Sequence, residues 1–259
     1  MKRKRLGEIN YNNKGCLMKI VEYNSYADII VEFQDEYKAR INTTYQNFQK
    51  GEVKNPYNKE VYNVGYLGQG KYSYKEHKHI YKIWQDMLKR CYSSYYMNKY
   101  PTYKDCYVCE EWHNFQNFAK WLDENYYEVK DEKMCLDKDI LFKRNKIYSP
   151  ETCIFVPERI NNLFVNRHRE RGNLPLGVIE DIDKRSGSKR LKVQCNMIEE
   201  GKTKRKNLGR FPLNRPFQAF YTYKQFKESY IKQIADEYKE LIPQKLYNAL
   251  YRYEVEIND

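Results

Sequence analysis

Cysteine and histidine side chains are the first candidates for chemistry in this chain of 259 residues. Cys106 and Cys109 have the Cys-x-x-Cys spacing of many zinc sites, and His113 follows four residues later. A structural zinc site would need a fourth ligand, for which Cys135 and Cys153 are candidates. The sequence has no second Cys-x-x-Cys pair, and a cysteine such as Cys109 is often a small apolar core residue. We therefore do not expect zinc.

Basic side chains form a second set of candidates, concentrated between residues 184 and 210 where the apolar residues alternate as in β-strands. Because alternate residues of a strand share a face, we expect Arg190 and Lys192 on one side, and likewise Lys204 and Lys206. Such a surface can contact DNA phosphates and guanine edges, or it can be only a solvated basic face. The candidate nucleic-acid contacts, including two in the preceding linker, are Arg167, Arg169, Lys184, Arg185, Arg190, Lys192, Lys204, Lys206 and Arg210.

The stretch between residues 136 and 162 carries the most specific motifs. It contains Leu-Asp-Lys-Asp at 136–139, Tyr-Ser-Pro at 148–150 and Ile-Asn at 160–161. These motifs and their spacing resemble the ββα-metal core of HNH nucleases, in the form found in phage and mobile-element homing endonucleases. The preceding helical residues are also similar to that family, so the resemblance covers roughly residues 80–165.

This resemblance implies that Asp137 and Asn161 bind one Mg²⁺ or Mn²⁺ ion, which would offset charge at the scissile phosphate. The family places a His general base directly after the metal-binding Asp, whereas this chain has Lys138. Lysine is a poor base at neutral pH because its ordinary pKa is about 10.4, so we expect Lys138 to contact phosphate. The family's central Asn falls near Thr152, and Asn145 in the preceding loop could substitute for it. Candidate catalytic residues are therefore Asp137, Lys138, Asn145 and Thr152.

The C-terminal part has a resemblance of its own. Gly177-Val178, the Leu-Gly-Arg-Phe run at 208–211 and the segment 217–221 are similar to the Apetala-type (ethylene-responsive-factor) DNA-binding domain, over about residues 173–240. The resemblance implies that a three-stranded sheet enters the major groove of DNA. The middle strand departs from the family, because it has Leu191 or Val193 where the family favours an aromatic residue.

The elements that must position these residues follow from hydrophobic periodicity. Alternation predicts N-terminal strands at 18–23 and 37–41, and a β-branched run predicts another at 28–33. Apolar steps of three and four residues predict helices over about 80–91 and 112–122. A strand, a basic loop and a second strand follow, and Pro157 opens a last helix that reaches residue 164.

Three further strands and a long helix are predicted after residue 172. The strands are expected at 176–182, 191–198 and 203–211. The helix follows Asn214, and its predicted apolar face includes Phe217, Tyr221 and Ile231. The expected fold class is α+β with several domains. These are a small β domain (1–74), an HNH-like ββα domain with two lead-in helices (75–168) and a three-stranded sheet on a long helix (169–259).

Composition narrows the classes of function. The chain has 47 Lys+Arg against 35 Asp+Glu, a net charge of +12, and 27 tyrosines. This balance favours a nucleic-acid partner, although an AT-rich genome would also enrich lysine and tyrosine. A mean hydropathy of −0.96 argues against a membrane protein. We expect no signal peptide, and the seven cysteines are expected to be reduced thiols in the cytoplasm, that of the host if the protein is phage-encoded.

Two functions are compatible with these patterns. The first is a phage-type protein of the homing-endonuclease kind, which binds double-stranded DNA and nicks or cuts it with a divalent metal ion. The alternative is a catalytically inactive HNH scaffold that acts as a nucleic-acid-binding regulator, or as an inhibitor of a host nucleic-acid-dependent defence system. In the second case the partner could be a host nucleic-acid-binding protein. The sequence leaves open whether the protein is an enzyme.

Overall fold

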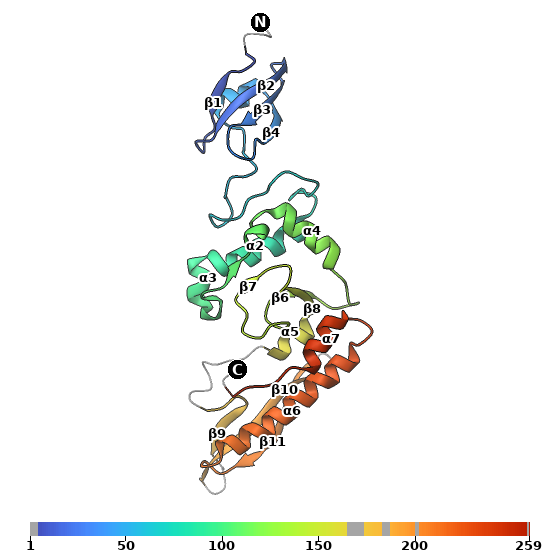
Figure 1. Ribbon diagram of the computed structural model, residues 1–259. Helices are drawn as coiled ribbons and strands as arrows, with labels where there is room; N and C mark the ends of the chain where they lie inside the picture. Colours follow the sequence, from blue (N-terminus) through green and yellow to red (C-terminus); the bar gives the residue numbers. More distant parts are fainter. Residues whose placement is uncertain (1–4, 165–173, 183–186, 200–201, 258) are drawn as a thin grey trace. The chain divides into compact units, whose positions relative to one another are not determined.

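The computed structural model describes residues 5–164, 174–182, 187–199, 202–257 and 259 (Figure 1). The chain has two compact units, which are treated separately below. One contains Met1–Asn125 and Lys146–Glu151, and the other contains Tyr126–Asn145 and Thr152–Asp259. The predicted α+β class is confirmed. Over the described ranges, none of the helices combines the length and the apolar character needed to span a membrane.

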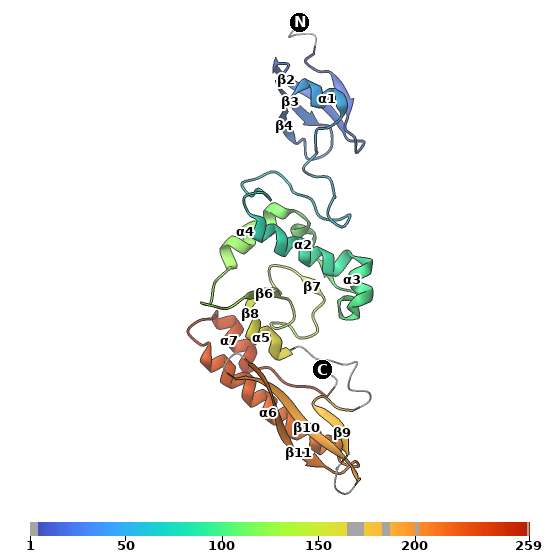
Figure 2. The same ribbon diagram turned by 180° about the vertical axis from the view of Figure 1, so that it is seen from behind.

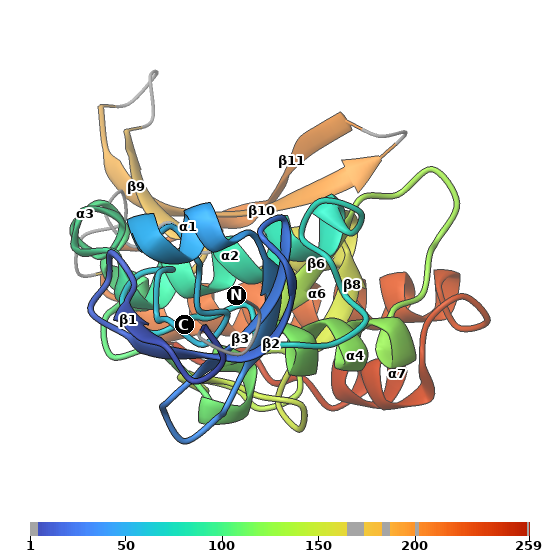
Figure 3. The ribbon, with the colours of Figure 1, turned by 90° about the horizontal axis from the view of Figure 1, so that it is seen from above.

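The first unit begins with a four-stranded antiparallel sheet in the order β1-β2-β3-β4. The strands are β1 (Ile9–Tyr11), β2 (Leu17–Ser25), β3 (Asp28–Phe33) and β4 (Arg40–Thr43). Alternate residues of β2 and β3 are buried, and they pack with Phe48 of α1 (Tyr45–Lys50), beside which the strands curve (Figure 3). This small sheet therefore has a core of its own.

The predicted strand at 37–41 begins later than the sequence suggests. Asp35 Oδ1 accepts hydrogen bonds from the backbone N–H groups of Tyr37 and Lys38, both at 3.1 Å, and Lys38 has a positive φ of 50°. These contacts form a turn, and β4 starts only at Arg40.

Helices form the rest of the first unit. They are α2 (Lys78–Tyr92), α3 (Ser94–Lys99), the 3₁₀ turns η2 (Pro101–Tyr103) and η3 (Glu110–His113), and α4 (Phe115–Asn125). Both α2 and α4 were predicted, and they bury Trp84, Phe115 and Phe118. The indole N–H of Trp84 donates to the Trp112 backbone carbonyl at 2.7 Å. Two short strands, β5 (Tyr107–Val108) and β7 (Ile147–Tyr148), pair in parallel and tie residues 146–151 to this unit.

The second unit starts with the predicted strand–loop–strand–helix order. It consists of β6 (Met134–Asp137), β8 (Ile154–Pro157), α5 (Glu158–Asn161) and the 3₁₀ turn η4 (Asn162–Phe164). A three-stranded antiparallel sheet follows, with β10 (Lys189–Glu199) between β9 (Val178–Ile182) and β11 (Lys202–Phe211). The unit ends with α6 (Pro216–Glu237) and α7 (Gln244–Tyr251).

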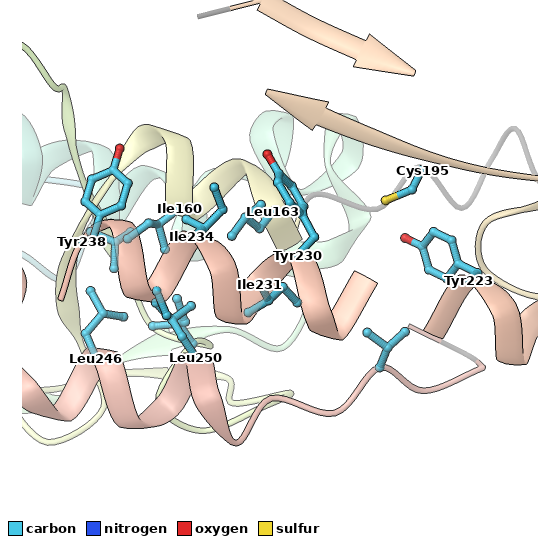
Figure 4. Packing of buried hydrophobic residues seen from close by; sticks show 14 of the residues in the cluster. Ile160, Leu163, Cys195, Tyr223, Tyr230, Ile231, Ile234, Tyr238, Leu246 and Leu250 are labelled. Carbon is cyan, nitrogen blue, oxygen red and sulfur yellow. The ribbon is translucent and has the colours of Figure 1, made fainter. Parts of the chain in front are cut away.

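Helix α6 covers one face of the β9–β11 sheet. The helix lies in front of the strands in Figure 1, and the strands lie in front of the helix in Figure 2. Ile231 and Ile234 of α6 pack with Leu246 of α7 and with Ile160 and Leu163, so α5 and η4 share this core (Figure 4). One continuous core therefore joins the β6–β8–α5 segment to the C-terminal sheet.

The apolar face of α6 differs from its prediction at the N-terminal end. Phe217 and Tyr221 are 74% and 57% exposed, whereas Ile231 is buried as expected. The buried positions in the first half of the helix are Ala219, Tyr223 and Lys227. The first half of the helix therefore turns Ala219 and Tyr223 toward the core, while the rings of Phe217 and Tyr221 point to solvent.

Candidate nucleic-acid interface

The two faces of the C-terminal sheet are set by the alternation of β10. Leu191, Val193 and Cys195 are buried, and they belong to the core that α6 covers. The residues between them face the opposite side, so Arg190 and Lys192 share the face that α6 leaves uncovered. Antiparallel register then decides which residues of β9 and β11 join them on each face.

A β-bulge changes the phase of β11. Val193 pairs with Gly209, but Gln194 pairs with Asn207, so Leu208 is the extra residue. Gly209 has a φ of 136° and brings no side chain to the inner face, where Leu208 packs against the core instead. From Asn207 toward the start of the strand, odd-numbered residues therefore face outward and even-numbered residues face α6.

The uncovered side, which we call the outer face, is basic and rich in amides. Its polar members on β10 and β11 are Arg190, Lys192, Gln194, Asn196, Arg205, Asn207 and Arg210. The Arg205 guanidinium donates to the Asn196 side-chain oxygen at 3.4 Å, and Arg210 forms an ion pair with Asp181 of β9 at 3.0 Å. Arginine is the commonest partner of guanine edges and asparagine or glutamine of adenine edges. The outer face therefore combines phosphate-binding charge with side chains that can read bases.

The structure separates the basic residues that the sequence grouped together. Lys204 and Lys206 share one side as expected, but this is the α6 side, and the Lys206 ammonium lies 5.0 Å from the ring centroid of Phe226 on α6. Arg205 lies on the outer face but is not among the predicted nucleic-acid contacts. The bulge at Leu208 determines which residues of β11 face outward, and the sequence pattern alone does not show it. Of the other candidates, Arg167, Arg169, Lys184 and Arg185 lie outside the described residues.

The β6–β8–α5 segment holds the residues that the HNH resemblance singled out. The two strands are antiparallel, with Asp137 at the end of β6 opposite Ile154 at the start of β8. Asn161 is the last residue of α5, and Thr152 lies in the loop that leads into β8. Both side chains are partly exposed. The order strand, strand, helix is that of a ββα arrangement.

Asp137 has a clear structural role. Its Oδ1 atom accepts hydrogen bonds from the backbone N–H groups of Asp139 and Ile140, both at 2.7 Å, and so closes the turn after β6. Burial raises the pKa of the Asp137 carboxyl, although these two hydrogen bonds act in the opposite direction. Carboxylate oxygens are of the ligand type that hard divalent cations prefer.

Lys138 is held inside the loop that Asp137 opens. The residue is only 6% exposed, and its ammonium forms an ion pair with Asp139 and donates to the Asn145 backbone carbonyl at 2.8 Å. Asn145 returns the contact, because its side-chain amide donates to the Lys138 carbonyl at 2.8 Å. These reciprocal hydrogen bonds close the loop between residues 138 and 145. The charged end of Lys138 therefore contacts atoms of this same loop.

In the first unit, the two cysteines of the Cys-x-x-Cys motif flank β5, and Cys109 directly precedes η3. His113 Nε2 is 3.2 Å from the Tyr92 hydroxyl, and burial lowers the pKa of this imidazole. Burial also raises the pKa of the Cys109 thiol, which favours its protonated form, and Cys106 is almost fully buried. Cys109 and His113 thus lie beside Tyr92 as partly buried side chains, whereas Cys106 lies next to the Thr102 carbonyl.

Comparisons with known proteins give this chain no relative. No family model, no curated protein and no solved structure matches it. The functional argument therefore depends on the geometry described above.

Proposed function

We propose that the protein binds double-stranded DNA through the outer face of its C-terminal sheet. The observation that carries this proposal is the composition of that face, where four basic side chains stand among three amides on two paired strands. The major groove of B-DNA admits a β-ribbon, and arginine and amide side chains are those that distinguish its base pairs. Phosphate contacts from the same cations would add affinity without sequence preference.

The β6–β8–α5 segment supports binding rather than cleavage. In the family that it resembles, a general base follows the metal-binding Asp, and the residue in that place here is Lys138. Its side chain is buried, donates to the Asn145 carbonyl and pairs with Asp139, so it is held by its own loop rather than presented as a general base. We therefore propose a DNA-binding regulator that keeps an HNH-like scaffold without cutting DNA through this site.

Duplex binding can be tested by fluorescence anisotropy with a labelled DNA duplex. The test variant Arg190→Ala/Arg205→Ala removes two charges from the outer face, and the matched control Lys204→Ala/Lys206→Ala removes two from the opposite side of the same sheet. We expect the test variant to weaken binding at least about tenfold, since one arginine contact to a base edge is worth about 1–3 kcal/mol. Equal weakening by both variants would contradict the proposal.

The absence of cleavage can be tested with supercoiled plasmid in Mg²⁺ or Mn²⁺, with EDTA as the reference. Asp137→Asn is the appropriate variant, because asparagine keeps the oxygen that accepts from Asp139 and Ile140 while it removes the charge that a metal ion needs. We expect no metal-dependent nicking by the native protein. Nicking that is present in the native protein and lost in Asp137→Asn would show an active metal site.

A further inference from the structure

A second basic and aromatic surface lies in the first unit, around the end of α2, α3 and η2. Residues 87–108 contain six tyrosines and four Lys or Arg residues, against Asp105 as the one acidic residue. Helix α3 buries none of its side chains. The side chains of α3 therefore lie at the surface rather than in a core.

The rings and cations on this surface contact one another. Tyr96 lies 4.6 Å from Tyr100 and 5.7 Å from Tyr103, measured between ring centroids. The Lys89 ammonium is 5.6 Å from the centroid of the Tyr96 ring, and the Lys99 ammonium is 5.4 Å from that of Tyr100. We call the set of Lys89, Tyr95, Tyr96, Lys99, Tyr100 and Tyr103 the tyrosine–lysine patch.

Part of this aromatic surface is open to solvent. Tyr95 is 72% exposed and Tyr100 is 40% exposed. Tyr95 and Lys99 are four residues apart on α3, so they share one face of the helix. An exposed ring next to a cation offers both a flat stacking platform and a charge within reach of the same ligand.

The backbone beneath the patch is well fixed. The Ser93 hydroxyl caps α3 by accepting the Tyr96 backbone N–H at 3.3 Å. The Lys146 ammonium donates to the backbone carbonyls of Thr102 and Lys104, at 3.2 and 3.3 Å. The exposed rings are thus carried by an ordered backbone, which reduces the conformational entropy lost when a ligand binds.

From these observations we propose that the tyrosine–lysine patch binds single-stranded nucleic acid. Exposed tyrosine rings can stack on unpaired bases, which a duplex keeps inside its own stack, and the lysines can pair with phosphates at the same time. An acidic peptide would satisfy the charge but would leave the flat rings without a matching partner. This site is independent of the outer face, and its test does not depend on duplex binding.

The test uses the full chain and a fluorescein-labelled twelve-nucleotide oligo(dT), with anisotropy as the readout. The variant Tyr95→Ala/Lys99→Ala removes one exposed ring and one charge from the patch. The matched control Tyr11→Ala/Lys14→Ala removes one ring from β1, where Tyr11 is 61% exposed, and one charge from the turn that follows this strand. We expect the patch variant to weaken oligo(dT) binding by about 5- to 100-fold and the control to leave it unchanged, given the stacking contribution of one ring.

Two further measurements decide the nature of the ligand. Tyr95→Phe keeps the ring and should bind oligo(dT) like the native protein. Polyglutamate should not compete with oligo(dT) at comparable charge concentration. The proposal is overturned if the patch variant binds as tightly as the control variant, if Tyr95→Phe loses as much affinity as the alanine variant, or if polyglutamate displaces the oligonucleotide equally well.

Discussion

Lys227 is a buried basic residue in the second unit, and its burial has a consequence for stability. It lies on α6, is 9% exposed and faces the sheet near Cys195. Burial lowers the pKa of the Lys227 ammonium, because the charged form loses its hydration inside the core. At neutral pH, keeping Lys227 buried therefore lowers the free energy of unfolding, whether the group is charged or has to lose its proton on folding.

Replacing this lysine should stabilise the fold. We expect Lys227→Met to raise the free energy of unfolding at pH 7 by about 1 kcal/mol or more, since methionine fills the same space without a charge. The pKa is lowered by folding, so the unfolded state binds more protons between the folded value and about 10.4, and native stability rises with pH in this window. The gain from Lys227→Met should therefore shrink between pH 7 and pH 10 in denaturant titrations.

Lys224, three residues earlier on the same helix, is the control. Its ammonium pairs with Glu228 at 2.6 Å and donates to the Val255 backbone carbonyl at 3.0 Å. Lys224→Met removes these contacts and should lower stability rather than raise it. If both methionine variants changed stability in the same direction, the interpretation of Lys227 as a costly buried charge would be wrong.

Among the elements, β11 shows what local patterns can and cannot predict. Alternation along β10 is uninterrupted, so it correctly predicts that Arg190 and Lys192 share a face. In β11 the alternation is broken at the bulge residue Leu208. Packing against the core beneath α6, and not the neighbouring sequence, determines that Leu208 faces inward. The exposure of Phe217 is a similar case, since hydrophobic residues at helical spacing do not reveal which of them the sheet covers.

The entry into β9 depends on a glycine that the core requires. Gly177 has a φ of 78°, and a Cβ atom there would lie 2.0 Å from the buried ring of Tyr223. Gly177→Ala should therefore destabilise the protein by about 2–4 kcal/mol, from overpacking and from the left-handed backbone together. Gly187 is a matched position, because its φ is 67° but nothing lies within 4 Å of an added Cβ. Thermal unfolding should show a loss of only about 1 kcal/mol for Gly187→Ala, and equal losses would exclude the contact with Tyr223 as the cause.

At the scale of the whole molecule, short-range sequence patterns predict the helices and strands better than they predict which of these elements pack together. The strand–strand–helix order of β6, β8 and α5 follows from sequence. The packing of Ile160 and Leu163 against Ile231 and Leu246 joins residues more than sixty positions apart, and no local period encodes it (Figure 4). The same limit applies to the candidate site, since the roles of Asp137 and Lys138 in closing their own loop depend on backbone geometry that residue types do not specify.

Net charge is a property of the whole chain, whereas DNA contacts are local. The salt dependence of DNA binding shows which of the two determines affinity. Arg190→Ala/Arg205→Ala and Lys204→Ala/Lys206→Ala both lower the net charge from +12 to +10. The slope of log K against log salt for duplex DNA falls by about 0.9 for each phosphate contact that is lost.

If the two arginines of the outer face bind phosphates, their removal should reduce the steepness of that slope by about 2, and the lysine variant should keep the native slope. Titrations between about 50 and 200 mM salt are wide enough to resolve this difference. Equal slopes for the two variants would mean that the chain attracts DNA through its total charge, because both variants carry the same charge and differ only in the face from which it was removed.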